Sequence, residues 1–137
     1  MGNRIDGGEL VARTLRQFGV EYAFGLHGGH LNSLLMGFRR NDITVIDTRH
    51  EAVAVNAADG YSRASGELGV AFATASAGFT NSLAGVGVAF ADRIPLLVLT
   101  SSPPLRDAEM NEAQGILAQA AIAAPMTVSE VGRTISG

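Results

Sequence analysis

The segment ITVIDTRHEAVAVNAADGYSRASGELGVAFAT, residues 43–74, has the pattern of a strand, a helix and a second strand. Residues 43–46 form a β-branched apolar run, which predicts a buried parallel strand. The alanine-rich stretch 50–65 predicts a long helix that Gly66 ends, and residues 68–74 predict another buried strand. This order of elements is typical of an α/β domain with a parallel sheet.

The remainder of the chain continues the alternation. Apolar residues at helical spacing over 8–18 predict a helix that Gly19 ends. Further helices are predicted from the HGGH loop at 27–30 onward, over 80–92 and over 112–123, and further strands over 21–26, 96–100 and 126–131. Because no hairpin signal joins the strands, the sequence predicts a three-layer α/β/α fold with a mainly parallel sheet.

Composition excludes several kinds of function. The 137 residues suit one domain, and 47% hydrophobic residues with a mean hydropathy of +0.21 indicate that part of the surface meets another protein. A net charge of −3 with scattered arginines argues against nucleic-acid binding, and no apolar run reaches the roughly 20 residues of a membrane span. The chain has no cysteine, so the cytoplasm is the expected compartment. It also has no lysine, which excludes Schiff-base chemistry and a P-loop.

Four loops carry polar and glycine-rich residues where a parallel sheet binds its ligands. In such folds the ligand lies beyond the carboxyl ends of the strands, in the loops that lead into helices. These loops are HGGH (27–30), DTRHE (47–51), ASAGFTN (75–81) and SSPP (101–104). The glycines of the chain do not form the G-x-G-x-x-G fingerprint, so a dinucleotide site is not supported. His27 and His30 lack the spacing of a helical metal pair, which argues against a metal site.

The DTRHE stretch has two interpretations. Thr48-x-x-Glu51 matches the capping box, in which the threonine caps the helix and the glutamate reaches back to the cap. A carboxylate in a first helical turn also interacts favourably with the helix dipole. The alternative is that Glu51 moves a proton in a ligand site. The pattern taken alone favours the cap, and Asn81 and Gln114 taken singly are typical of caps and surface amides.

Longer stretches resemble a known family. They are GGELVARTLRQFGVEYAFGLHGGH, IDTRHEAVAVNAADGYSRASGELGVAFATASAGFTN and GVAFADRIPLLVLT. Together they resemble the N-terminal, pyrimidine-binding domain of thiamine-diphosphate-dependent enzymes, and among these the benzaldehyde lyases and acetolactate-synthase-like carboligases. The resemblance covers roughly residues 6–127. It implies a pyrimidine-binding domain over 1–127 and a tail over 128–137.

The resemblance also implies roles for particular residues. The glutamate of the RHE motif falls on Glu51, where it would hydrogen-bond N1′ of the cofactor's aminopyrimidine and so activate the cofactor. Apolar neighbours such as Val45 and Ile46 are expected to form its pocket. His30 and Gln114 would handle protons on the bound substrate. The residues expected to line the cofactor pocket, in addition to Glu51, are Gly25, Leu26, Thr74 and Asn81.

One half of the family's site has no counterpart in this sequence. The family holds Mg²⁺ and the diphosphate with a Gly-Asp-Gly segment and an asparagine in a second domain, so a separate diphosphate-binding domain or subunit is expected, and no metal ligands in this chain. The resemblance further implies a homo-oligomer formed through the helices, and as substrates 2-hydroxy ketones, aldehydes or 2-oxo acids. Three explanations stay open: a subunit of a split enzyme, a fragment of an acetolactate-synthase-like enzyme, or a non-catalytic interaction or regulatory module that keeps the fold.

Overall fold

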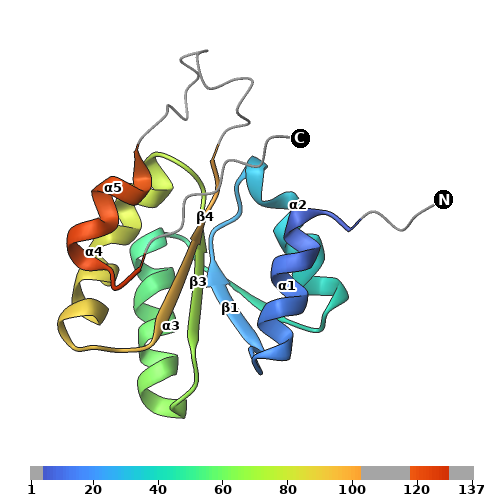
Figure 1. Cartoon of the computed structure of the whole chain (residues 1–137), viewed down its shortest axis with the longest axis horizontal. Helices are drawn as coiled ribbons and strands as arrows, with labels where there is room; N and C mark the ends of the chain where they lie inside the picture. Colours follow the sequence, from blue (N-terminus) through green and yellow to red (C-terminus); the bar gives the residue numbers. More distant parts are fainter. Residues whose placement is uncertain (1–4, 103–117, 130–137) are drawn as a thin grey trace.

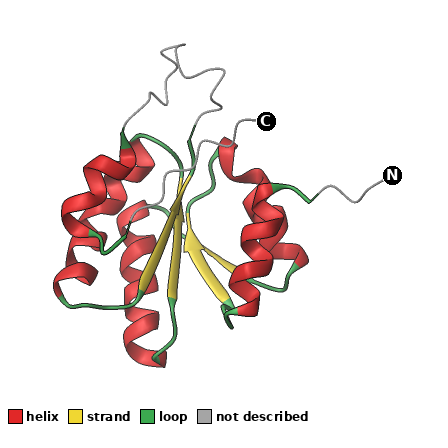
Figure 2. Ribbon diagram, viewed as in Figure 1, coloured by secondary structure: helices red, strands yellow, loops and turns green. Residues whose placement is uncertain are grey.

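A computed structural model of the chain describes residues 5–102 and 118–129. Its elements follow the chain in this order: α1 (Gly7–Gln17), β1 (Tyr22–Gly25), η1 (Gly29–Leu31), α2 (Asn32–Arg40), β2 (Thr44–Asp47), α3 (Glu51–Ser65), β3 (Gly69–Ala73), α4 (Ala77–Ala91), β4 (Leu96–Thr100), α5 (Gln119–Ala123) and η3 (Ala124–Met126). Helices α1 and α2 cover one face of the sheet and α3 and α4 cover the other, with α5 beside α4 (Figures 1 and 2). The three-layer α/β/α prediction is confirmed.

The sheet has four strands in the order β2-β1-β3-β4, and every neighbouring pair is parallel. In this register Gly25, the last residue of β1, pairs with Asp47 on one side and with Phe72 on the other. Ala73 pairs with Thr100 at the end of β4. The carboxyl ends of all four strands therefore meet at one edge, which brings together the loops that the sequence analysis singled out.

The core divides into two clusters, one on each face of the sheet. Val70 and Phe72 of β3 point to the α1–α2 side, and Ala71 between them packs on the other side against Val55 of α3 and Val86 of α4. All five residues of β3 are buried, as the predicted strand over 68–74 requires. This alternation along β3 holds both helical layers on a single central strand.

Glycines end two of the helices as predicted. Gly19 follows α1 with a φ of 84°, and Gly66 caps α3 with a φ of 76°. This left-handed conformation favours a residue without a Cβ atom. At the other end of α1, the carboxylate of Asp6 accepts a hydrogen bond from the backbone N–H of Glu9 over 2.8 Å. The start and end of α1 and the end of α3 thus have local causes in the sequence.

Two of the strand predictions were wrong. The strand predicted as buried at 43–46 is β2, an edge strand in which all four residues are exposed, because β1 covers only one of its sides. Residues 126–129 do not form a strand, since Met126 ends η3 and residues 127–129 have no regular secondary structure. The helix predicted over 112–123 is described only as α5, and its earlier part lies outside the described residues. No helix within the described ranges is both long and apolar enough to cross a membrane.

Candidate active site

Glu51 is the first residue of α3, directly beyond the carboxyl edge of the sheet. The backbone N–H of Thr48 donates to the carbonyl of Gly25 over 2.9 Å, which holds the loop after β2 against the end of β1. Nδ1 of His50 accepts a hydrogen bond from the backbone N–H of Ala52 over 3.2 Å, so His50 is the N-cap of α3. These contacts aim Glu51 into the molecule, where it is only 7% exposed.

The capping-box interpretation of DTRHE was therefore wrong for both of its members. The hydroxyl of Thr48 donates to the carbonyl of His50 over 3.3 Å and does not reach the N–H groups of the first helical turn. The carboxylate of Glu51 does not turn back to the cap. It crosses to α4, where Oε2 accepts a hydrogen bond from Nδ2 of Asn81 over 3.0 Å.

Among the described residues, no cation accompanies this buried carboxylate. In the described part of the chain Glu51 forms no ion pair, and Ala77–Ala91, the whole of α4, contains no charged residue. Nearby, Arg49 is paired with Asp47 over 2.6 Å at the surface. Burying a carboxylate with only a neutral amide as its partner opposes folding. Such groups gather at functional sites more often than elsewhere in a fold.

The wall around Glu51 is not the one that the sequence suggested. Val45 and Ile46 are each 38% exposed on the edge strand, so the prediction that they form an apolar pocket was wrong. The wall comes instead from α4 and the end of β3. A Cβ atom added to Gly78 would lie 3.2 Å from Oε1 of Glu51 and 2.8 Å from Cγ2 of Thr74. Gly78 therefore keeps the space in front of Oε1 free of side chain.

The loop between β3 and α4 has an unusual backbone. Ser76, the N-cap residue of α4, has a φ of 60° and a ψ of −109°, a conformation that residues with a Cβ atom rarely adopt. The end of β4 holds this loop, because Oγ of Ser101 accepts from the backbone N–H of Ala75 over 3.0 Å and lies 3.4 Å from Oγ1 of Thr74. Strained backbone that its surroundings hold in place is found preferentially at ligand sites.

Glycines also let the end of β1 and the loop after it lie close to β3 and to Thr74, the residue that follows β3. A Cβ atom at Gly25 would overlap the ring of Phe72, and one at Gly28 would lie 2.5 Å from Cβ of Thr74. The predicted cofactor-binding residues Gly25, Thr74 and Asn81 are thus brought to the same edge as Glu51, and Leu26 follows directly on Gly25.

Of the two other predicted catalytic residues, the structure describes only His30. His30 lies exposed in η1, and no hydrogen bond or ion pair joins it to Glu51 among the described residues. Gln114 lies outside the described residues. Sequence reasoning missed Gln119, whose Nε2 donates to the carbonyl of Ser101 over 3.0 Å. Its Oε1 is buried and has no hydrogen-bond partner within the described part of the chain. It also missed Gly78, which the sequence marks simply as the glycine of the ASAGFTN loop.

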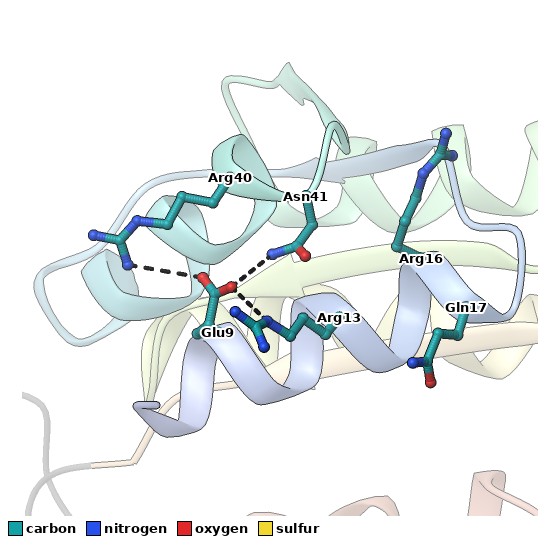
Figure 3. Close-up of a pocket in the computed structure, with 6 residues that line it drawn as sticks. All are labelled: Glu9, Arg13, Arg16, Gln17, Arg40 and Asn41. Atoms are coloured by element: carbon teal, nitrogen blue, oxygen red, sulfur yellow. Dashed lines mark hydrogen bonds and ion pairs between the residues drawn. The ribbon is translucent and has the colours of Figure 1, made fainter. Parts of the chain in front are cut away.

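A hollow with a volume of about 500 Å³ lies away from this edge, between α1 and α2 (Figure 3). Its lining is polar: Glu9, Arg13, Arg16, Gln17, Arg40 and Asn41. Glu9 is the centre of a clamp between the two helices, accepting from Arg13 over 2.8 Å and from Asn41 over 3.2 Å. These bonds, the one from Arg13 first, hold the pKa of Glu9 below its ordinary value. Glu9, Arg13, Arg40 and Asn41 are engaged with one another, so this part of the hollow is explained as a structural contact between the two helices.

Comparison with known proteins bears on the strand-end site. The family described as "Thiamine pyrophosphate enzyme, N-terminal TPP binding domain" matches residues 5–122. The chain belongs to this family. The resemblance noted in the sequence is thereby confirmed, and with it the α/β pyrimidine-domain fold and thiamine diphosphate, also called thiamine pyrophosphate, as the cofactor of the family.

Individual relatives of this thiamine pyrophosphate enzyme domain fall into two groups by name. The 2-hydroxyacyl-CoA lyase 2 of Homo sapiens is 47% identical over 93 residues, which are 68% of this chain and 15% of that protein. The acetolactate synthase large subunit IlvG of Mycobacterium tuberculosis is 41% identical over 100 residues, 73% of this chain and 18% of that protein. For the probable acetolactate synthase large subunit of Methanocaldococcus jannaschii the identity is 39% over 102 residues, 74% and 17% of the two chains. The chain thus spans less than a fifth of the length of these relatives.

Among the described residues, the strand-end site has a chemistry that suits the aminopyrimidine of the cofactor. Glu51 offers a carboxylate oxygen, and Gly78 leaves room in front of it. Within residues 5–102 and 118–129, no group of three or more histidine, cysteine, aspartate or glutamate side chains is placed to hold a metal ion.

Proposed function

We propose that this chain is the pyrimidine-binding half of a thiamine-diphosphate-dependent lyase or carboligase, in which Glu51 exchanges a proton with the cofactor. The observation that carries the proposal is the carboxylate of Glu51, 7% exposed at the strand ends, with no cation among its described neighbours. A carboxylate that an arginine or lysine holds has its acceptor sites occupied. Among the described residues Oε1 of Glu51 has no such partner, so it is available to bind a ring nitrogen of a ligand.

When bound, thiamine diphosphate supplies a nucleophilic carbon that adds to a substrate carbonyl group. The part of this chain is to hold the aminopyrimidine and to keep a proton available at N1′ through Glu51. Thr74 and the glycines at 25 and 28 shape the pocket, because their close packing leaves no room for a bulkier loop. His30 and Gln114 are proposed to transfer protons on the substrate side.

The proposed reaction breaks or forms a carbon–carbon bond next to a carbonyl group. The relatives' names, 2-hydroxyacyl-CoA lyase and acetolactate synthase, support substrates that are 2-hydroxy acyl compounds, 2-hydroxy ketones, aldehydes or 2-oxo acids. Mg²⁺ and the diphosphate are proposed to be held by a separate diphosphate-binding domain or subunit. A cytoplasmic location stays a prediction from composition, as does the boundary between a domain over 1–127 and a tail over 128–137.

Exposed apolar residues support an assembly. Val53 on α3 is 54% exposed, and Val88 and Phe90 on α4 are 52% and 43% exposed. Helices α3 and α4 pack side by side, so these residues are proposed to contribute to a homo-oligomer or to the contact with the diphosphate-binding domain. A non-catalytic interaction module would keep such residues too. It would have no use for a buried carboxylate without a cation, which is why the catalytic proposal is favoured.

The test is an NMR titration of the ¹⁵N-labelled chain with 4-amino-5-(hydroxymethyl)-2-methylpyrimidine, the aminopyrimidine half of the cofactor. We expect shift changes around Glu51, Gly78 and Asn81, and affinity at least about tenfold weaker for Glu51→Gln, because the variant loses a charge-assisted hydrogen bond. Glu67→Gln, an exposed carboxylate on the loop after α3, is the matched control. Equal affinities for the wild type and Glu51→Gln, or shift changes confined to α1 and α2, would overturn the proposal.

A further inference from the structure

We propose that Asn81 is a positioning residue that gives the two oxygens of Glu51 different tasks. Asn81 holds Oε2 throughout, and Oε1 alone exchanges the proton with the ligand. The inference rests on the proposed function of Glu51 and adds the residue that orients it and the atom that acts.

The hydrogen bond from Nδ2 of Asn81 to Oε2 of Glu51 is 3.0 Å long and joins residues 30 positions apart in the chain. The amide must be the donor in this pair, because an ionised carboxylate has no hydrogen to give. Asn81 itself is exposed, whereas Glu51 is buried. The bond therefore ties a buried acid to a side chain that contributes little to the core.

Both ends of this bond stand on fixed backbone. On the Glu51 side, the His50 cap and the bond from Thr48 to Gly25 hold the start of α3. On the Asn81 side, a Cβ atom at Gly85 would lie 2.7 Å from Cγ1 of Val55, so α4 lies directly on α3. A bond between two fixed helices sets the rotation of the carboxyl group, which a bond from a mobile loop would not.

Oε1, the other oxygen of Glu51, faces Gly78, a position of α4 that carries no side chain. Gly78 precedes Asn81 by three residues, so the two lie on one face of α4. The hypothetical Cβ of Gly78 is 3.2 Å from Oε1, and among the described residues Oε1 accepts no hydrogen bond. One face of α4 thus presents a donor to Oε2 and no side chain to Oε1.

This asymmetry determines where a proton is held. A proton on Oε2 would point at the N–H of Asn81, so the neutral form of Glu51 carries its proton on Oε1. In the transfer, the O–H bond at Oε1 breaks as an N–H bond forms on the ligand's ring nitrogen, and the reverse step restores it. Oε2 remains an acceptor from Asn81 in both states. Because α4, β1 and β3 carry no charged residue, and Arg49 is paired with Asp47, no cation competes for Oε1 in the described structure.

The experiment is a double-mutant cycle on the full chain, with the same aminopyrimidine as the probe and its dissociation constant from NMR titration as the readout. The variants are Asn81→Leu, which removes the donor at similar size, Glu51→Gln, and the two combined. Asn81→Gln tests rescue by another amide, and Thr80→Ala is the control at an exposed neighbour. We expect Asn81→Leu to weaken binding about tenfold in the wild-type background and less than about twofold in the Glu51→Gln background, because Asn81 acts through Glu51. We also expect Asn81→Gln to recover part of the loss.

Every other outcome contradicts either the proposed function or the role of Asn81. If the wild type does not bind the probe, the proposed function fails and this inference with it. If Glu51→Gln weakens binding but Asn81→Leu does not, only the role of Asn81 is overturned. Equal losses from Asn81→Leu in both backgrounds mean that Asn81 contacts the ligand directly, which also overturns the inference. Asn81→Ala replaces Asn81→Leu if the leucine variant does not fold. The same loss from Thr80→Ala would show that the effect is not specific to the donor.

Discussion

Nδ1 of His50 accepts the hydrogen bond from the backbone N–H of Ala52 over 3.2 Å, so a histidine caps the helix that begins with Glu51. We predict that His50→Ala lowers the free energy of unfolding by about 0.5–2 kcal/mol, the usual effect of losing an N-cap. His50→Asn should retain most of the stability, because an asparagine side chain accepts the same bond. Urea denaturation at neutral pH measures both. Equal stability of His50→Ala and the wild type would show that the cap is not formed in solution.

The clamp around Glu9 predicts a loss of stability in acid. Hydrogen bonds from Arg13 and Asn41 lower the pKa of Glu9 from its ordinary value of 4.5. As the pH falls, the unfolded chain therefore takes up a proton at this position before the folded chain does. The contribution of Glu9 is complete above about pH 4.5 and is lost as the pH falls through the lowered pKa of the folded state.

Urea denaturation between pH 7 and pH 3 measures this dependence. We expect Glu9→Gln to lose less stability over that range than the wild type does, and Glu67→Gln, which alters an exposed side chain, to follow the wild type. Asp6, whose pKa is lowered chiefly by the hydroxyl of Ser33, keeps part of the acid dependence in every variant. A Glu9→Gln profile as steep as that of the wild type would contradict the clamp.

Two glycines in α4 provide a matched pair for the contact between α3 and α4. A Cβ atom at Gly85 would lie 2.7 Å from Cγ1 of Val55, whereas one at Gly87 would meet nothing within 4 Å. We predict that Gly87→Ala raises the free energy of unfolding by about 0.5–1 kcal/mol through helix propensity alone. Gly85→Ala should lower it, since overpacking typically costs about 1–3 kcal/mol. If thermal melting shows both variants stabilised, α4 does not lie against α3 as described.

Elements with a local cause were predictable from the sequence. Strand β4 occupies the predicted range 96–100, and Gly66 ends α3 because a left-handed residue is needed there. The prediction for β2 was wrong because position within a sheet depends on the order of all strands. An apolar run has the same pattern in a central strand and at an edge.

The site shows the same division. Family resemblance identified Glu51 and, as residues expected to line the same pocket, Gly25, Thr74 and Asn81. The partner of Glu51 was not predictable from local pattern, since Asn81 reaches it only through the packing of α4 on α3. Thr48-x-x-Glu51 has the spacing of a capping box, but the helix begins at Glu51 with His50 as its N-cap. Thr48 is therefore too far from the first helical turn to cap it. A helix start that differs by two residues changes which side chain caps and which turns inward.

The central claim is that Glu51 hydrogen-bonds N1′ of the cofactor. The most direct measurement is the ¹⁵N NMR signal of thiamine diphosphate labelled at N1′, recorded with Mg²⁺ in the presence of the wild-type chain and of Glu51→Gln. The account predicts that the N1′ resonance moves toward the protonated position with the wild type and stays at the free position with Glu51→Gln. A shift of equal size with both proteins, or with neither, would contradict it.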